Sequence, residues 1–234
     1  MVREMVLNDD GKTTFSNIML KGKAKNNYKQ ITRDMIFKET VVKTKRNGEQ
    51  VTELRLNADY WKNIRKTYPN GINVVIDEAH TLINSRRAMS KENVIMNDFM
   101  SLLRRILGDS GEGYGELVLI TQLGRRLDVI ARDLSTSIHY HLCHYRRVCD
   151  GCGFRFWETN EIYQKPKKCP ICGSKKMRKD NFIIEKWEFK DMDHCDLWLE
   201  NGHRTYQTHY YITDIQKYFS YYDTHQWENL ISEY

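Results

Sequence analysis

The chain contains the stretch Asn73-Val74-Val75-Ile76-Asp77-Glu78-Ala79-His80, a β-forming apolar run that ends in two adjacent carboxylates. A short apolar run of this kind predicts a strand that is covered on both faces of a sheet. Its acidic end has two explanations. Asp and Glu suit the positive end of a helix dipole, so the strand could simply lead into a helix. Alternatively, a buried strand of a nucleotide-driven motor delivers an Asp to Mg²⁺ and a Glu to the attacking water.

Three further segments are predicted to be strands: residues 13–18, 116–122 and 137–145. Residues 92–107 carry apolar side chains at helical spacing and predict an amphipathic helix between two of these strands. Strands that alternate with helices form parallel sheets, and ligands bind beyond the carboxyl ends of such strands. Asp77, Glu78 and Gln122 are all expected at that edge. The predicted fold class is therefore α/β, with a parallel sheet flanked by helices.

The remaining segments are expected to complete the same domain. Asn47-Gly48 predicts the turn of a polar hairpin over residues 43–53, and residues 57–67 predict a helix. The last expected elements are two strands that return the chain to the main sheet and a short helix, at residues 181–189, 206–212 and 213–219.

Four cysteines form a regular pattern, in which Cys149 and Cys152 are followed, after sixteen residues, by Cys169 and Cys172. This C-x2-C-x16-C-x2-C spacing is typical of zinc sites, since each pair folds into a tight turn whose two sulfurs point at one ion. Four thiolates complete a tetrahedral shell with no open position, so a structural zinc is expected. The predicted boundaries are a core at residues 1–146 and 182–234 and an inserted zinc ribbon at residues 147–181.

The predicted ribbon is basic, with nine Lys and Arg against four Asp and Glu over residues 147–181. Thiolates around Zn²⁺ carry net negative charge, so part of this excess balances the metal site. The remaining basic residues and their aromatic neighbours could contact phosphates and bases, pair with a protein partner, or form a solvated surface. These residues are Phe154, Phe156, Trp157, Lys165, Lys167, Lys168, Lys175, Lys176, Arg178 and Lys179.

The composition is that of a folded globular protein, with 40% hydrophobic and 29% charged residues among 234. No apolar run approaches the roughly 18 residues that a membrane helix needs, and the N-terminus lacks the apolar core of a signal peptide. We therefore expect a cytoplasmic protein. Cysteines in that compartment stay reduced, which favours metal binding over disulfides.

Five segments can be compared with a known family: residues 14–18, residues 74–80, Leu103-Arg104-Arg105, Leu119-Ile120-Thr121-Gln122 and Tyr221-Tyr222-Asp223-Thr224. Together they resemble the zonula occludens toxin-like ATPases of the FtsK–HerA superfamily. Members of that family have a RecA-like P-loop NTPase fold, are usually hexameric, and move DNA in virus assembly or DNA transfer. The resemblance implies a motor that packages DNA or extrudes virions. Its partners would be DNA, copies of itself, and a coat or membrane protein, in the host cytoplasm if the source is a virus.

Roles for individual residues follow from the resemblance. Asp77 would organise Mg²⁺, Glu78 would be the general base, and Gln122 would sense the γ-phosphate. Arg104 or Arg105 would be an arginine finger that completes the site of a neighbouring subunit, because a guanidinium stabilises charge in the transition state. A solvated helix face explains these two arginines equally well. The implied cofactors are Mg-ATP and a structural zinc.

The chain departs from the family at the phosphate loop G-x-x-x-x-G-K-[ST], whose backbone N–H groups hold the phosphates. The candidate Asp10-Gly11-Lys12-Thr13 lacks the upstream glycine, because Val6 occupies that position. Residues 1–7 are better explained as the end of the helix that follows such a loop, and residues 8–11 as its exit turn. The loop is then expected upstream of Met1, on another polypeptide, or to have been lost together with hydrolysis.

Two other functions agree with parts of the sequence. Asp77-Glu78-Ala79-His80 spells the DEAH motif of a helicase group, and residues 122–126 resemble the arginine motif of that group. Those helicases carry the second motif in a second RecA-like domain, for which this chain is too short. The other alternative is a non-hydrolysing DNA-binding or assembly subunit on a degenerate ATPase core. The missing loop favours that alternative, whereas the acidic strand end and Gln122 disfavour it.

His139, His141 and Cys143 alternate along one predicted strand and raise the question of a second metal. Three ligands on one strand rarely converge, so a half-buried strand near a sheet edge is the simpler explanation. Cys143 and Cys195 lie outside the four-cysteine pattern and are expected to be small buried side chains.

Overall fold

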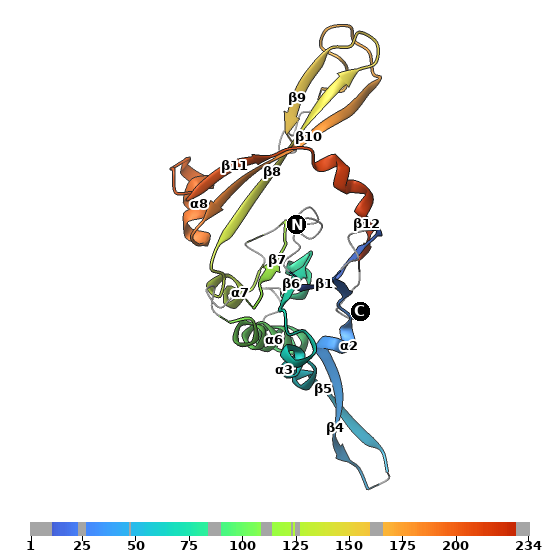
Figure 1. Ribbon diagram of the computed structural model, residues 1–234, viewed down its shortest axis with the longest axis vertical. Helices are drawn as coiled ribbons and strands as arrows, with labels where there is room; N and C mark the ends of the chain where they lie inside the picture. Colours follow the sequence, from blue (N-terminus) through green and yellow to red (C-terminus); the bar gives the residue numbers. More distant parts are fainter. Residues whose placement is uncertain are drawn as a thin grey trace. The chain divides into compact units, whose positions relative to one another are not determined.

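The computed structural model divides the chain into two units (Figure 1). The first comprises Met1–Leu134 and Ser220–Tyr234, and the second comprises Ser135–Phe219. The chain therefore leaves the first unit once and re-enters it near its end. The structure describes residues 11–22, 27–46, 48–83, 90–108, 114–122, 124, 127–159 and 166–227.

A parallel sheet of four strands forms the centre of the first unit, in the order β3-β1-β6-β7. The strands are β1 (Thr13–Ser16), β3 (Tyr28–Gln30), β6 (Ile72–Ile76) and β7 (Leu117–Leu119). Phe15, Val74 and Ile76 are fully buried, as expected for strands that are covered on both faces. The predicted strands at the start of the chain, at the acidic stretch and before Gln122 are confirmed. The predicted α/β class, with helices flanking a parallel sheet, is also confirmed. This arrangement is compatible with a RecA-like fold.

Helix α6 (Lys91–Leu107) confirms the predicted amphipathic helix and packs against this sheet. Its first turn is capped by the Ser90 hydroxyl, which accepts from the Asn93 N–H at 3.2 Å. Met96, Phe99 and Leu103 line its buried face and have no solvent exposure. The helix thus covers the sheet through one continuous apolar stripe.

The helix predicted over residues 57–67 is divided into α3 (Ala58–Lys62) and α4 (Ile64–Thr67). The division falls at Asn63, whose side-chain amide donates to the Asp59 carbonyl at 3.0 Å. Such a local bond competes with the backbone ladder of a helix. Trp61 is nevertheless fully buried, and its indole N–H donates to the Met35 carbonyl at 2.7 Å. Three further short helices complete the described helices of this unit: α2 (Arg33–Ile36), α5 (Ala79–Leu82) and α7 (Val129–Asp133).

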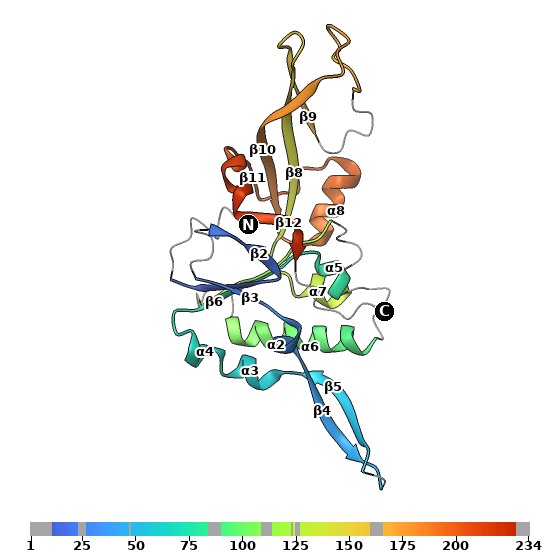
Figure 2. The same cartoon turned by 90° about the vertical axis from the view of Figure 1, so that its right-hand side faces the viewer.

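The polar hairpin is longer than the predicted residues 43–53 and consists of β4 (Phe37–Thr44) and β5 (Gln50–Leu56). It projects from the body of the first unit in both views (Figures 1 and 2). Gly48 has φ +81°, a left-handed conformation that the tight turn requires and that glycine adopts without strain. A small second pair joins β2 (Ile18–Leu20) to β12 (Tyr222–Trp227), so the closing segment of the chain pairs beside the end of β1.

The second unit contains an antiparallel sheet in the order β11-β10-β8-β9. Its elements are β8 (Ile138–Cys149), β9 (Arg155–Thr159), β10 (Met177–Phe189), β11 (Thr208–Ile212) and helix α8 (Met192–Asn201). The expectation that residues 181–189 and 206–212 return to the main sheet is wrong, because both pair within this separate sheet. The structural unit, Ser135–Phe219, also extends well beyond the predicted insertion at 147–181.

The physical reason for this error lies in the side-chain alternation of β8. Ile138, Tyr140 and Leu142 face the core that α8 covers, whereas His139 and His141 are exposed. A period of two is typical of an antiparallel sheet with one covered face and differs from the continuous apolar run of β6. The segment predicted as a helix at 213–219 is a 3-10 helix over Ile215–Tyr221. No helix in the described part of the chain is long and apolar enough to cross a membrane.

Candidate functional site

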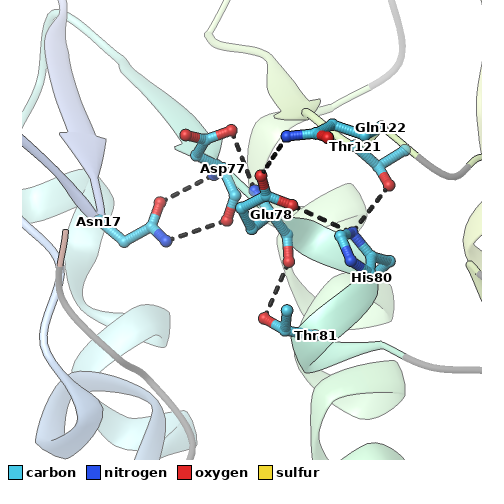
Figure 3. Close-up of polar contacts among 7 residues, drawn as sticks. All are labelled: Asn17, Asp77, Glu78, His80, Thr81, Thr121 and Gln122. Carbon is cyan, nitrogen blue, oxygen red and sulfur yellow. Dashed lines mark hydrogen bonds and ion pairs between the residues drawn. The ribbon is translucent and has the colours of Figure 1, made fainter. Parts of the chain in front are cut away.

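Asp77 lies immediately beyond the carboxyl end of β6, and Asn17 holds its backbone in place (Figure 3). The Asn17 amide donates to the Asp77 carbonyl at 3.0 Å and accepts from the Asp77 N–H at 2.8 Å. Asn17 is almost completely buried. Its two bonds to the Asp77 backbone extend the β1–β6 pairing beyond Ser16 and Val75, the last paired residues of the two strands.

Glu78 adopts a left-handed backbone conformation, with φ 51° and ψ 39°. The other described non-glycine residues with positive φ are Asn27, Asn181 and Asp214, whose short polar side chains tolerate this region. For a glutamate the conformation costs on the order of 1–2 kcal/mol, and such strain persists where the surroundings enforce it, often at functional sites.

Two neighbouring side chains hold the Glu78 carboxylate. Gln122, at the end of β7, donates from Nε2 to Glu78 Oε1 at 2.9 Å. His80 Nδ1 lies 3.3 Å from Glu78 Oε2 and 3.0 Å from the Thr121 hydroxyl. In the tautomer with a proton on Nδ1, His80 donates toward the Glu78 carboxylate and the Thr121 hydroxyl accepts from the same N–H; in the other tautomer the Thr121 hydroxyl donates to Nδ1. The carboxylate is therefore oriented from the ends of two adjacent parallel strands (Figure 3).

Burial raises the pKa of the Asp77 carboxyl above its ordinary value of 3.8. A hydrogen bond from the Glu78 N–H opposes this shift, and the neighbouring Glu78 charge adds to it. Two carboxylates at one strand end offer oxygen atoms of the kind that divalent cations bind, although on their own they do not complete a coordination shell. Asp77, Glu78 and Gln122 are thus close together, as expected for the carboxyl edge of the sheet.

Replacing Asp77 by asparagine should stabilise the protein at neutral pH. A raised pKa means that the folded state holds this proton more tightly than the unfolded chain, so stability falls as pH rises above the ordinary pKa. Asparagine removes the charge and keeps an oxygen for the Glu78 N–H. Solvent screens part of the effect, so we expect at most about 1 kcal/mol, or a Tm higher by about 2–4 °C at pH 7. Thermal unfolding should show this gain shrinking towards pH 4; a lower Tm for Asp77→Asn would contradict it.

Arg104 and Arg105 do not join this group within the chain. Both are exposed on the last turn of α6. Leu107, the last residue of that helix, lies near the amino end of β6. Gly115 shows this, because a Cβ atom added to it would contact both the Leu107 side chain and the carbonyl of Ile72, the first residue of β6. With about 25 Å of helix between its ends, α6 places the two arginines at the opposite edge of the sheet from Asp77.

Gly11, Lys12 and Thr13 also lie at that opposite edge. Thr13 pairs with Ile72 at the start of β6, and the Lys12 side chain approaches Gly71. A phosphate held there would be at the wrong end of the parallel strands to reach Asp77. This placement rules out the segment as a phosphate loop for the acidic site. Residues 1–10, including the predicted helix end, lie outside the described residues.

Cys149, Cys152, Cys169 and Cys172 form the one cluster of potential metal ligands among the described residues, with all four sulfurs within 4.8 Å of one another. The Cys149–Cys172 and Cys152–Cys169 sulfur pairs are 3.5 and 3.7 Å apart. Tetrahedral zinc with Zn–S bonds of about 2.3 Å separates its sulfurs by about 3.8 Å. The cluster could therefore hold a metal ion such as zinc.

The two cysteine turns have the same backbone geometry. Gly153 N–H donates to the Cys149 carbonyl at 2.8 Å, and Gly173 N–H donates to the Cys169 carbonyl at 2.9 Å. Gly153 and Gly173 have φ +73° and +70°, left-handed values at equivalent positions. Glycine lets each turn close behind its cysteine pair, so both pairs of sulfurs converge.

The other predicted candidates behave differently. His139, His141 and Cys143 form no metal-ligand cluster in the described part of the chain. Cys195 is buried against Trp187 and Phe189, and burial raises the pKa of its thiol to about 11. Cys195 is thus a small core side chain, as expected.

Asn17, His80 and Thr121 were not predicted as site residues. Asn17 and Thr121 lie near the carboxyl ends of the predicted strands 13–18 and 116–122, and polar residues at the end of a buried strand are a usable signal. Their partners, however, lie 60 and 41 residues away along the chain, and the contacts appear only once the strands are paired.

Comparison with family models and with curated proteins gave no match. Among solved structures, the N-terminal domain of zonular occludens toxin from Neisseria meningitidis is similar to this chain. The two share 19% identity, the match covers 95% of this chain and 90% of the other, and the TM-score is 0.42. At that distance the likeness carries no argument about activity.

Proposed function

We propose that this chain is a subunit of an ATP-hydrolysing motor that moves DNA, of the packaging or extrusion type. The observation that supports this most is the juxtaposition, at the carboxyl ends of β6 and β7, of a half-buried Asp77 with a Glu78 carboxylate bonded to Gln122 at 2.9 Å. Hydrolytic nucleotide sites use this combination of a cation ligand, a base and a polar sensor.

Asp77 would bind Mg²⁺, since a carboxylate is the ligand that this cation prefers. Mg²⁺, when bound with ATP, would neutralise phosphate charge. Glu78 would accept the proton of the attacking water, and its bonds to His80 and Gln122 orient the carboxylate for that transfer. Gln122 would exchange its bond to Glu78 for one to a phosphate oxygen and so act as the γ-phosphate sensor.

The motor would need a phosphate loop from a segment other than residues 11–13, which lie at the wrong end of the parallel strands. In the described part of the chain β7 is the last strand of the parallel sheet and pairs with β6 alone. A strand that carries the loop could add to the other edge of β7, which would place the phosphates beside Gln122 and Glu78.

We further propose that the motor is a ring of six identical subunits. The exposed Arg104 and Arg105 would then face the nucleotide of a neighbouring subunit, because they cannot reach the site of their own chain. The four-cysteine cluster would hold a structural zinc, and a coat or membrane protein would be a further partner. The host cytoplasm would be the compartment of a viral motor.

A non-hydrolysing DNA-binding or assembly subunit is the second candidate. The specific observation in its favour is that the only lysine-containing loop candidate, Gly11-Lys12-Thr13, lies at the wrong edge of the sheet. A helicase is less well supported, because the DEAH spelling would need a second RecA-like domain.

DNA-stimulated ATP hydrolysis separates a motor from an assembly subunit. Protein with a complete phosphate loop should hydrolyse ATP, and DNA should increase the rate because translocation couples the two. Hydrolysis without any response to single- or double-stranded DNA would reject the motor. No hydrolysis, with DNA binding retained, would favour the assembly subunit.

A further inference from the structure

At the ribbon end of the second unit, β10, β8 and β9 lie side by side in the antiparallel sheet (Figures 1 and 2). Arg146 on β8 pairs with Trp157 on β9. Val148, two residues further along β8, pairs with Arg155 on β9 and with Arg178 on β10. Directly paired residues share a face, and so do residues two apart along a strand. One face of the sheet therefore carries Arg146, Arg155, Trp157 and Arg178 around the buried Val148, together with Asp180 opposite Arg146; we call it the arginine–tryptophan face.

Trp157 is 48% exposed, an unusual position for the largest apolar side chain on the surface of a sheet. The guanidinium of Arg146 lies 6.0 Å from the centre of its ring. An exposed indole with guanidinium groups beside it provides a flat surface on which a base can stack, together with donors for the adjoining phosphates.

Two carboxylates orient the arginines without occupying their outer donors. Arg146 Nε lies 2.7 Å from Asp180, and Arg178 Nε lies 3.1 Å from Asp150. The hydrogen bond from Arg146, with smaller contributions from the charges of Arg178 and Arg155, holds the pKa of Asp180 below its usual range. Because both ion pairs use Nε, the Nη groups keep donors in the fork geometry that fits phosphate.

The surrounding surface has the same sign of charge. The described residues 146–159 and 166–180 contain nine Lys and Arg against three Asp and Glu. This excess exceeds what four thiolates around a divalent ion would balance. A polyanion is the partner that such charge favours.

We propose that the arginine–tryptophan face binds single-stranded nucleic acid, with one base stacked on Trp157 and phosphates on Arg146, Arg155 and Arg178. A duplex keeps its bases stacked on one another, whereas a single strand can turn a base onto the indole. This binding surface goes beyond the proposed motor, because it consists of residues of the second unit alone. Binding of the single strand to it requires no ATP.

Fluorescence anisotropy with an oligothymidylate of about 20 nucleotides, without ATP, tests this face on the full zinc-loaded chain. Trp157→Ala should weaken binding about tenfold or more, and Trp157→Phe should restore most of the loss because phenylalanine still stacks. Arg155→Ala should weaken binding and reduce the salt dependence, d log K/d log[salt], by about 0.7. Arg204→Ala is the matched control. Arg204 is also an exposed arginine beside an aromatic ring, 5.4 Å from Tyr206, but outside this face, and its loss should change nothing.

Three results would overturn the proposal: equal affinity of Trp157→Ala and wild-type protein, binding of a duplex as tight as that of the single strand, or no oligonucleotide binding at about 0.1 M salt. Equal zinc content in all variants would exclude misfolding as the cause of a loss. Because ATP is absent from the assay, failure of this face leaves the hydrolysis test of the motor unaffected.

Discussion

Replacing Glu78 by glutamine should reduce ATP hydrolysis at least 100-fold in protein that has a complete phosphate loop. Glutamine keeps the size of the side chain and an oxygen that can accept from Gln122, so the site should remain assembled. It cannot take the proton of the attacking water, and general-base catalysis contributes about 10²–10⁴-fold to such reactions. Steady-state phosphate release measures the loss, and ATP binding should remain near the wild-type level.

Glu116→Gln is the matched control for this prediction. Glu116 is exposed at the start of β7, at the opposite edge of the sheet from Gln122. Its substitution removes the same charge beside the neighbouring strand, at the amino end of β7, without touching the acidic site. Equal hydrolysis by Glu78→Gln and wild-type protein would show that another group is the base.

Replacing Cys169 by serine should remove the metal and unfold the ribbon. Cys169 is buried, and its sulfur lies 3.7 Å from that of Cys152. Zinc in such sites contributes on the order of 10 kcal/mol to the fold that binds it, and three thiolates without the fourth lose most of this affinity. Zinc should fall from one per chain to a small fraction of that, measured by elemental analysis after dialysis.

The rest of the second unit should survive this substitution. The β8–β10 ladder continues far beyond the cysteines, and Trp187 and Phe189 pack under α8 at its other end. Cys143→Ser is the control, because Cys143 lies on the same strand as Cys149 but outside the cluster. Wild-type protein without metal, or Cys169→Ser with a full complement of zinc, would show that the cluster is not a zinc site.

Buried strands and paired cysteines could be predicted from the sequence because their signals are local. Val74 and Ile76 require cover on both faces wherever the strand lies, and the two C-x2-C pairs need the same turn in any ribbon. The membership of strands in sheets was harder to predict. Residues 138–142 alternate between apolar and polar, a signal of a half-covered antiparallel sheet, and their assignment to the parallel core was wrong.

The contacts that orient the acidic site depend on tertiary structure. Asn17 is a strand-end residue in the sequence, and its role arises because β1 and β6 lie side by side with their ends in register. His80 reaches Thr121 only because β7 is the next strand. The arginine–tryptophan face likewise required the register of three strands, since its arginines are separated by the cysteine turns along the chain.

Binding of Mg-ATP tests the nucleotide site at the ends of β6 and β7 most directly. Titration calorimetry on protein with a complete phosphate loop should detect ATP binding that depends on Mg²⁺. Asp77→Asn should weaken it about tenfold or more, because the amide is a poorer ligand for the cation than the carboxylate. Absence of ATP binding in that protein, or binding that is indifferent to both Mg²⁺ and Asp77, would contradict the assignment of this site.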